Sequence, residues 1–170
     1  HKIGGPKGAG ALVINSEKKI NSLIKGGSQE KNLRAGTEPL IALAGFGKAA
    51  RYSNIEAMAK LQSLRDFFEE RLIDLNCGIF IIGKNSIRLP NTFMFSLPNI
   101  KSENLIMALD LEGFEVSSGS ACSSGKVENS KTLMAMGFKE NISSSAIRIS
   151  LGSYNTKLDA INFANKVKDI

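Results

Sequence analysis

A chain of 170 residues, 42% of them hydrophobic, has the length and composition of about one globular domain. Its 22 lysines and arginines against 16 acidic residues leave a net charge of +6, which permits an acidic partner without requiring one. These values exclude a disordered tail, a collagen-like fibre and a disulfide-stapled miniprotein, and the longest apolar runs are too short to cross a membrane.

The cysteines and the start of the chain bear on its compartment and its completeness. Cys77 and Cys122 are too few for a disulfide framework, so we expect a reducing, cytoplasmic location. The glycine-rich first residues do not form the apolar block of a signal peptide. Because the chain starts at His1 rather than Met, we expect a processed chain or a piece of a longer one.

The first half of the chain predicts one strand, one long loop and a long helical region. Residues 9–15 (AGALVIN) predict a short strand after a Gly/Pro turn. Residues 26–39 have no hydrophobic period and many turn formers, which predicts a loop of a length that is often functional. Residues 40–76 have a helical period, within which Gly45 and Gly47 predict a bend or a break.

The second half predicts alternating strands and helices. The expected strands cover residues 79–82, 92–96, 114–117 and 146–150. The expected helices cover residues 102–111, with Ser102 as the cap, about 130–136, and 158–167, the last opened by a Thr156–Asp159 capping box. This alternation predicts an α/β or α+β class.

The glycine-rich start, GGPKGAG, lacks the residues of a phosphate loop. No Gly-Lys-Ser/Thr follows at the required offset, and the third glycine of a dinucleotide fingerprint is missing. A structural turn is therefore the ordinary interpretation. Lys2 precedes this turn directly, however, and a lysine held against a turn can form an imine when burial keeps it partly deprotonated.

The two cysteines differ in their neighbours. Cys77 stands beside the apolar residues 79–82, which predicts a buried and inert side chain. Cys122 stands in SSGSACSSG (residues 117–125), whose small residues offer the mobility and access that a nucleophilic thiolate needs. No stable metal site is expected, because there is no CxxC pair and His1 is the single histidine.

Arg148 and Thr37 are the remaining polar candidates. Strand alternation over residues 146–150 places Arg148 on the face opposite Ile147 and Ile149. Arg148 is either an exposed strand residue or a two-point clamp for a substrate carboxylate, which a guanidinium suits better than an ammonium. Thr37, in the loop, is either an ordinary cap or a hydroxyl donor to a phosphate.

Together these residues resemble the carboxy-terminal part of a NifS/IscS-type cysteine desulfurase, a pyridoxal-phosphate enzyme of the class-V aminotransferase type. Four stretches carry the resemblance: HKIGGPKGAGAL (1–12), GGSQEKNLRAGTEP (26–39), SSGSACSSG (117–125) and SSAIRISLGSYNT (144–156). The resemblance implies the carboxy-terminal part of a fold-type I transferase of the α/β class. Residues 1–57 would be a remnant of the large cofactor domain, and residues 58–170 the small α+β domain with the cysteine loop.

The resemblance also implies a role for each candidate residue. Lys2 would bond to the aldehyde of pyridoxal phosphate and move protons, and His1 would help to hold the cofactor phosphate. Thr37 would donate to the phosphate bound by the neighbouring subunit of a homodimer. Arg148 would clamp the carboxylate of the substrate cysteine, and Cys122 would receive its sulfur.

The implied function is conversion of L-cysteine to L-alanine, with a persulfide on Cys122 that supplies sulfur to iron–sulfur cluster assembly or another acceptor. A sulfur-acceptor or scaffold protein would then be a partner, and Cys122 could serve as a transient cluster ligand. The family's long part upstream of its lysine is missing here, so we expect this chain alone to be inactive. No membrane is expected as a partner. No nucleic acid is expected either, because the positive charge is taken as spread along the chain and no recognition motif occurs.

Three other interpretations remain open. A selenocysteine lyase or a related aminotransferase would share the fold, although an aminotransferase needs no thiol. A stand-alone sulfur-carrier or interaction domain would use Cys122 alone. A basic nucleic-acid binder would depend on the net charge.

Overall fold

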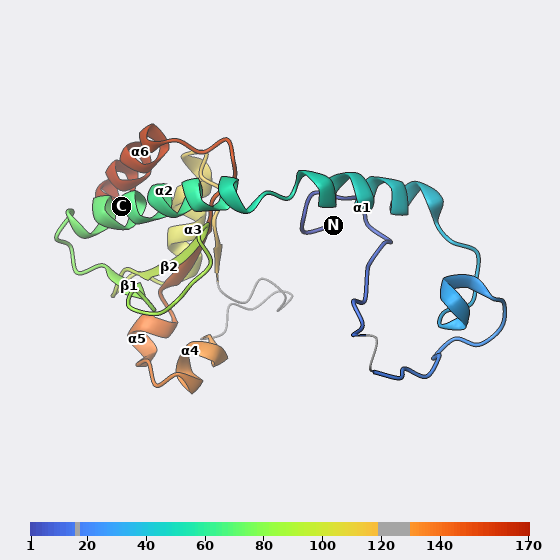
Figure 1. Cartoon of the computed structure of the whole chain (residues 1–170). Coiled ribbons are helices and arrows are strands. Elements are labelled where there is room, and N and C mark those ends of the chain that lie inside the picture. Colours follow the sequence, from blue (N-terminus) through green and yellow to red (C-terminus); the bar gives the residue numbers. More distant parts are fainter. Residues whose placement is uncertain (16–17, 119–129) are drawn as a thin grey trace. The chain divides into compact units, whose positions relative to one another are not determined.

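The computed structural model describes residues 1–15, 18–118 and 130–170. The chain divides into two compact units, His1–Asn54 and Ile55–Ile170 (Figure 1). The division falls three residues before the boundary expected at residue 57. The two units differ in the interactions that stabilise them.

The first unit has little regular structure. It contains the short 3₁₀ helix η1 (Gln29–Asn32) and the α-helix α1 (Leu40–Tyr52), which buries none of its residues. Among the residues described in this unit, Ala35 alone is buried, at 6% exposure. The first unit therefore has no hydrophobic core of its own within the described residues.

The second unit consists of an antiparallel sheet between helices. Its elements are α2 (Ile55–Ile73), β1 (Phe80–Ile82), β2 (Thr92–Ser96), α3 (Ser102–Leu111), β3 (Ser117–Ser118), α4 (Lys131–Ala135), α5 (Glu140–Ser143), β4 (Ala146–Ser150) and α6 (Lys157–Asp169). The strand order is β1-β2-β4-β3, and every neighbouring pair is antiparallel. This sheet, rather than a parallel one, makes the unit α+β.

The main core lies between one face of the sheet and helices α2, α3 and α6. Phe93 and Phe95 of β2 stand opposite Ile149 and Ile147 of β4 and project into it. The ring of Phe163 in α6 packs edge-on against that of Phe95, at 6.1 Å between centroids. Alternation along both strands thus sends these apolar side chains to one face.

The opposite face of the sheet carries a smaller cluster. Ala146 of β4 and Ile82 of β1 pack there with Leu133 of α4, and the partly buried Met94 joins them. Arg148 pairs with Met94 in register, so its side chain also belongs to this face. The prediction that Arg148 lies opposite Ile147 and Ile149 is confirmed.

The helix termini follow local chemistry. Thr156 and Asp159 form the predicted capping box: Asp159 accepts from the Thr156 amide at 2.7 Å, and the Thr156 hydroxyl accepts from the Asp159 amide at 3.3 Å. Ser130 caps α4. Lys166 lies 2.7 Å from Glu112, which ties α6 to the end of α3, and this hydrogen bond raises the pKa of Lys166 above its ordinary value. The prediction that Ser102 caps α3 is wrong, because Lys101 occupies the cap and Ser102 is the first helical residue.

Three expectations for the secondary structure are also wrong. Residues 9–15 form no strand, since a strand needs a hydrogen-bonded partner and the described part of the first unit contains no other strand. The helical region does not break at Gly45 or Gly47 but after Tyr52, where Ser53 is extended at ψ 113°. Of the strand expected at 114–117, only Ser117 belongs to a described strand, β3, while the Phe114 amide donates to the Leu109 carbonyl at 2.9 Å in the turn that follows α3.

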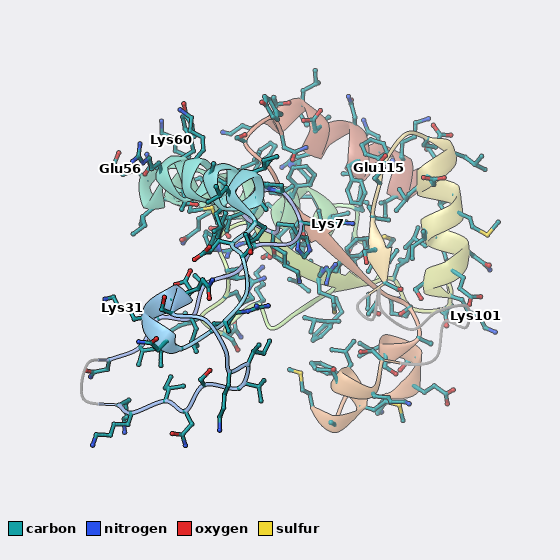
Figure 2. The ribbon with its side chains drawn as sticks, turned by 90° about the vertical axis from the view of Figure 1, so that its right-hand side faces the viewer. Lys7, Lys31, Glu56, Lys60, Lys101 and Glu115 are labelled. Atoms are coloured by element: carbon teal, nitrogen blue, oxygen red, sulfur yellow. The ribbon has the colours of Figure 1, made fainter. Side chains whose placement is uncertain are left out.

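The net charge is not spread along the chain, contrary to the sequence-based assumption. The first unit holds nine basic and three acidic residues, whereas the second holds 13 of each. The whole excess of +6 therefore lies in the first unit. Lys7 and Lys31 are two of its exposed cations (Figure 2).

Candidate functional site

Lys2 lies in a tight turn at the start of the first unit. The Gly4 amide donates to the His1 carbonyl at 2.9 Å, and this hydrogen bond closes the turn around Lys2. Gly4 adopts φ +90°, a left-handed conformation that glycine reaches without a steric cost. The Lys2 side chain is exposed, and no described group forms an ion pair or hydrogen bond with it. The amine is therefore available to a ligand.

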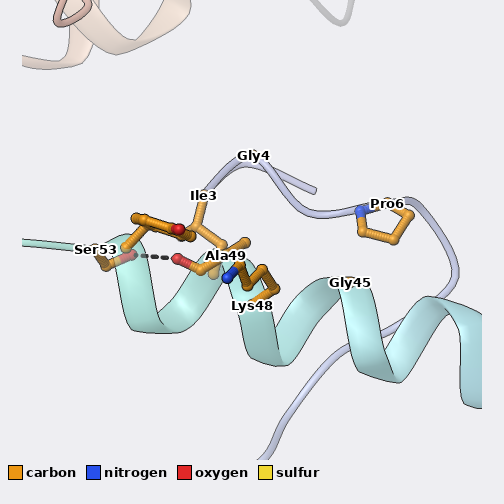
Figure 3. A pocket seen from close by; sticks show the side chains of 8 residues that line it. Ile3, Gly4, Pro6, Gly45, Lys48, Ala49 and Ser53 are labelled. Carbon is orange, nitrogen blue, oxygen red and sulfur yellow. Dashed lines mark hydrogen bonds between the residues drawn. The ribbon is translucent and has the colours of Figure 1, made fainter.

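The segment after this turn packs on one face of α1. A shallow pocket of about 420 Å³ lies between them, lined by Ile3 and Pro6 on one side and by Gly45, Ala49 and Tyr52 on the other (Figure 3). The helix residues are spaced by three or four, so they share one helical face. Helix α1 thus supports the segment that carries Lys2.

Thr37 lies near the end of the loop that precedes α1. The loop is fixed just before it: the Ala35 amide donates to the Ile24 carbonyl at 3.1 Å, and the Gly36 amide donates to Oε1 of Gln29 at 3.3 Å. The Thr37 side chain is exposed. Its hydroxyl is therefore presented on a loop whose backbone is partly anchored.

Arg148 lies near the middle of β4 and is half-buried. Its nearest described partner is Ser117 of β3, its register neighbour, whose Oγ is 3.5 Å from Nη2 of Arg148. The other three arginines of the second unit, Arg65, Arg71 and Arg88, each form an ion pair with a carboxylate. Arg148 has no carboxylate partner among the described residues, so its guanidinium can bind an anionic ligand.

The expectation that Cys77 is buried is wrong. Cys77 is exposed, because it lies in the turn between α2 and β1 rather than beside the core. Asn76 and Gly78 flank it at φ +52° and +82°, which makes this a tight reversal that faces solvent. Cys122 lies outside the described residues, so the structure does not compare the two thiols.

The described candidates fall on both units. His1, Lys2 and Thr37 belong to the first unit and Arg148 to the second. An amine can bond to an aldehyde, and an imidazole and a hydroxyl can donate hydrogen bonds to a phosphate. All three side chains are exposed, so these residues fit pyridoxal phosphate in type. Within the described ranges, no group of three acidic, cysteine or histidine residues could hold a metal ion. No described helix is long and apolar enough to span a membrane.

Comparison with solved structures supports a mixed α/β fold of the NifS type. The chain is similar to a NifS-like protein from Rickettsia africae, with a TM-score of 0.75 and 36% identity over 91% of this chain and 41% of that one. A second solved NifS-like protein has a TM-score of 0.82 and 35% identity, over 99% of this chain and 44% of that chain.

Comparison with curated sequences leads to the same family. The cysteine desulfurase IscS of Dictyoglomus turgidum is 44% identical over 162 residues, which cover 94% of this chain and 41% of the relative. A cysteine desulfurase of Sinorhizobium fredii is 39% identical over 163 residues, or 94% and 42%. The chain thus spans about two fifths of the length of these relatives. The aminotransferase class-V family model matches residues 1–163, and the chain belongs to this family.

Proposed function

We propose that this chain is the part of a cysteine desulfurase that carries the cofactor lysine, the substrate clamp and the sulfur-accepting thiol. One observation carries the proposal: the span matched by the family model contains Lys2, Thr37, Cys122 and Arg148 together with His1. The curated relatives that cover the same span are cysteine desulfurases. The presence of Cys122 in this span also suits that reaction better than amino-group transfer, which needs no thiol.

The cofactor of the proposed enzyme is pyridoxal phosphate, which supplies an electron sink for bonds at the substrate's carbon atoms when it is bound. Lys2 would hold it through the amine, and the His1 imidazole and the Thr37 hydroxyl would donate to its phosphate. The available Lys2 amine and the anchored loop before Thr37 support these assignments. In the proposed homodimer, Thr37 serves the cofactor of the neighbouring subunit.

Arg148 binds the substrate carboxylate in this proposal. A guanidinium offers two parallel N–H donors, and the Arg148 side chain is half-buried without a described carboxylate partner. Partial burial strengthens such a bond relative to one in open water. The remaining contact with Ser117 is long, at 3.5 Å, so a ligand carboxylate competes with it at little cost.

Cys122 accepts the sulfur. The carbon–sulfur bond of L-cysteine breaks, a sulfur–sulfur bond forms on the Cys122 thiol, and the carbon gains a proton, so that L-alanine and a persulfide result. The sulfur is oxidised and the carbon is reduced, which balances the reaction without another oxidant. A sulfur acceptor or an iron–sulfur scaffold protein would then take the persulfide sulfur.

The test compares the chain alone with the chain expressed together with a polypeptide that supplies the remaining length of its relatives. With pyridoxal phosphate, L-cysteine and a thiol reductant that releases the persulfide sulfur as sulfide, we expect alanine and sulfide from the pair and none from the chain alone. Cys122→Ser should abolish turnover while the visible absorbance of bound cofactor remains, and Lys2→Ala should remove that absorbance. Cys77→Ser is the matched control and should turn over normally. Full turnover by Cys122→Ser would contradict the proposal.

A further inference from the structure

We propose that Gly45 is a positioning residue for Lys2: it leaves room for Pro6 on α1 and thereby anchors the turn that presents the Lys2 amine. The inference rests on the proposed function, in which Lys2 holds the cofactor. It assigns a role to a helical glycine that sequence patterning alone treats as a weak point.

The contact between Gly45 and Pro6 is close enough to exclude any side chain. A Cβ at Gly45 would lie 2.7 Å from both Cγ and Cδ of Pro6, well inside van der Waals distance. One residue earlier in the segment, a Cβ at Gly5 would lie 3.3 Å from the Cα of Phe46. The two backbones therefore approach each other at this point, as Figure 3 shows for the Pro6 ring above the helix.

This contact bears on Lys2 because the intervening chain is short and constrained. Pro6 has a fixed φ, and the turn closed by the Gly4 amide on the His1 carbonyl ends two residues before it. A displaced Pro6 therefore displaces the turn. The pocket beside the contact is shallow and open, so few other contacts would hold the segment in place.

The chain supplies a matched control on the same helix. A Cβ at Gly47 would meet no atom within 4 Å, whereas a Cβ at Gly45 would meet Pro6. Alanine raises helix propensity at both sites by about the same amount, roughly 1 kcal/mol. Any effect specific to Gly45→Ala must therefore come from the contact with Pro6 and not from the helix.

The first measurement follows tryptic cleavage after Lys7 relative to cleavage after Lys25 in the 170-residue chain. Cleavage after Lys7 requires the segment to leave α1, so we expect Gly45→Ala to raise this ratio about fivefold or more. Gly47→Ala should leave it unchanged. Pro6→Ala removes the two clashing ring atoms, so adding it to Gly45→Ala should return the ratio to that of Pro6→Ala alone. Equal ratios for the two glycine variants, or no rescue, would overturn the inference.

The second measurement follows the visible absorbance of bound pyridoxal phosphate in the chain paired with the remaining length of its relatives. We expect Gly45→Ala to weaken the binding that this absorbance reports about tenfold, with rescue by Pro6→Ala, because small misplacements of a reacting group carry large penalties. If Lys2→Ala keeps the absorbance, the proposed function fails. If Lys2→Ala loses it but Gly45→Ala behaves like Gly47→Ala, the positioning role alone fails.

Discussion

The guanidinium of Arg88 donates two hydrogen bonds to the carboxylate of Glu69, with Nη1–Oε1 at 2.6 Å and Nη2–Oε2 at 3.2 Å. The side chains are 15% and 4% exposed, so the pair is largely removed from water. It joins the loop between β1 and β2 to helix α2. Arg65 of the same helix adds a second tie, since its Nη1 donates to the Leu89 carbonyl at 2.7 Å.

Removing one member of this pair should destabilise the second unit. Glu69→Gln leaves the Arg88 charge buried without a counter-charge, for which we expect a loss of about 3 kcal/mol in the free energy of unfolding. Urea unfolding followed by circular dichroism would measure it. Asp74→Asn, which breaks the exposed pair with Arg71, is the control and should change the free energy by less than about 0.5 kcal/mol.

The double replacement Glu69→Gln with Arg88→Met separates two causes of that loss. If an uncompensated charge is responsible, the double variant should recover much of the lost stability. Nε of Arg88 is already buried without a hydrogen-bond partner, so the replacement by Met also removes the free-energy cost of that unpaired donor. A double variant less stable than Glu69→Gln alone would show that packing, rather than charge, dominates.

Replacing Arg148 should affect substrate binding in the proposed enzyme. Arg148→Gln removes the charge and the two-point geometry, so we expect KM for L-cysteine to rise about 10- to 100-fold, from the usual worth of a charged hydrogen bond. Arg148→Lys keeps the charge, so its KM should lie between those of the unchanged enzyme and Arg148→Gln. Steady-state kinetics would measure both. Arg71→Gln, at an exposed arginine, is the control, and an unchanged KM in Arg148→Gln would contradict the assignment.

Alkylation should distinguish the two thiols. Cys77 is exposed and therefore accessible to the reagent, so the expectation of a faster Cys122 rests on its serine- and glycine-rich neighbours alone. With limiting iodoacetamide, mass mapping of the native chain should find most label on Cys122. The Cys77→Ser variant should lose only the smaller share. Equal or preferential labelling of Cys77 would contradict a nucleophilic role for Cys122.

The two units should differ in stability when they are separated. Ile55–Ile170 contains the main core and should unfold cooperatively in urea, whereas His1–Asn54, in which Ala35 alone is buried among the described residues, should show no cooperative transition. Circular dichroism of the two fragments would test this. A sharp transition in the first fragment would mean that its own contacts hold it together.

Sequence patterns predicted the second unit well because each element there has a strong local signal. The bounds of β2, β4 and α3 agree with the expected ranges 92–96, 146–150 and 102–111. The two strands alternate cleanly between a buried and a less buried face, and α3 ends at Leu111, two residues before the left-handed Gly113. The capping box was likewise predictable, because both of its side chains lie within four consecutive residues.

The failures come from interactions that a local pattern does not contain. A strand at residues 9–15 would require a partner strand, and the apolar side chains there, such as Val13 at 94% exposure, are instead uncovered. Cys77 was expected to be buried from its sequence neighbours, although a left-handed Asn76 turns the chain outward before them. Gly45 could not be distinguished from Gly47, because the difference depends on Pro6, far away along the sequence.

The position of β4 in the sheet has a consequence for synthesis of the chain. Among the described strands, β4 leaves the ribosome last, yet it lies between β2 and β3. The β1–β2 hairpin can form early, whereas β3 has no partner until β4 inserts. Both edges of the insertion site stay unpaired until then, and unpaired strands invite association between nascent chains. Arg148 therefore reaches its place beside Ser117 only in the closing step of sheet formation, after the segment with Cys122 has been made.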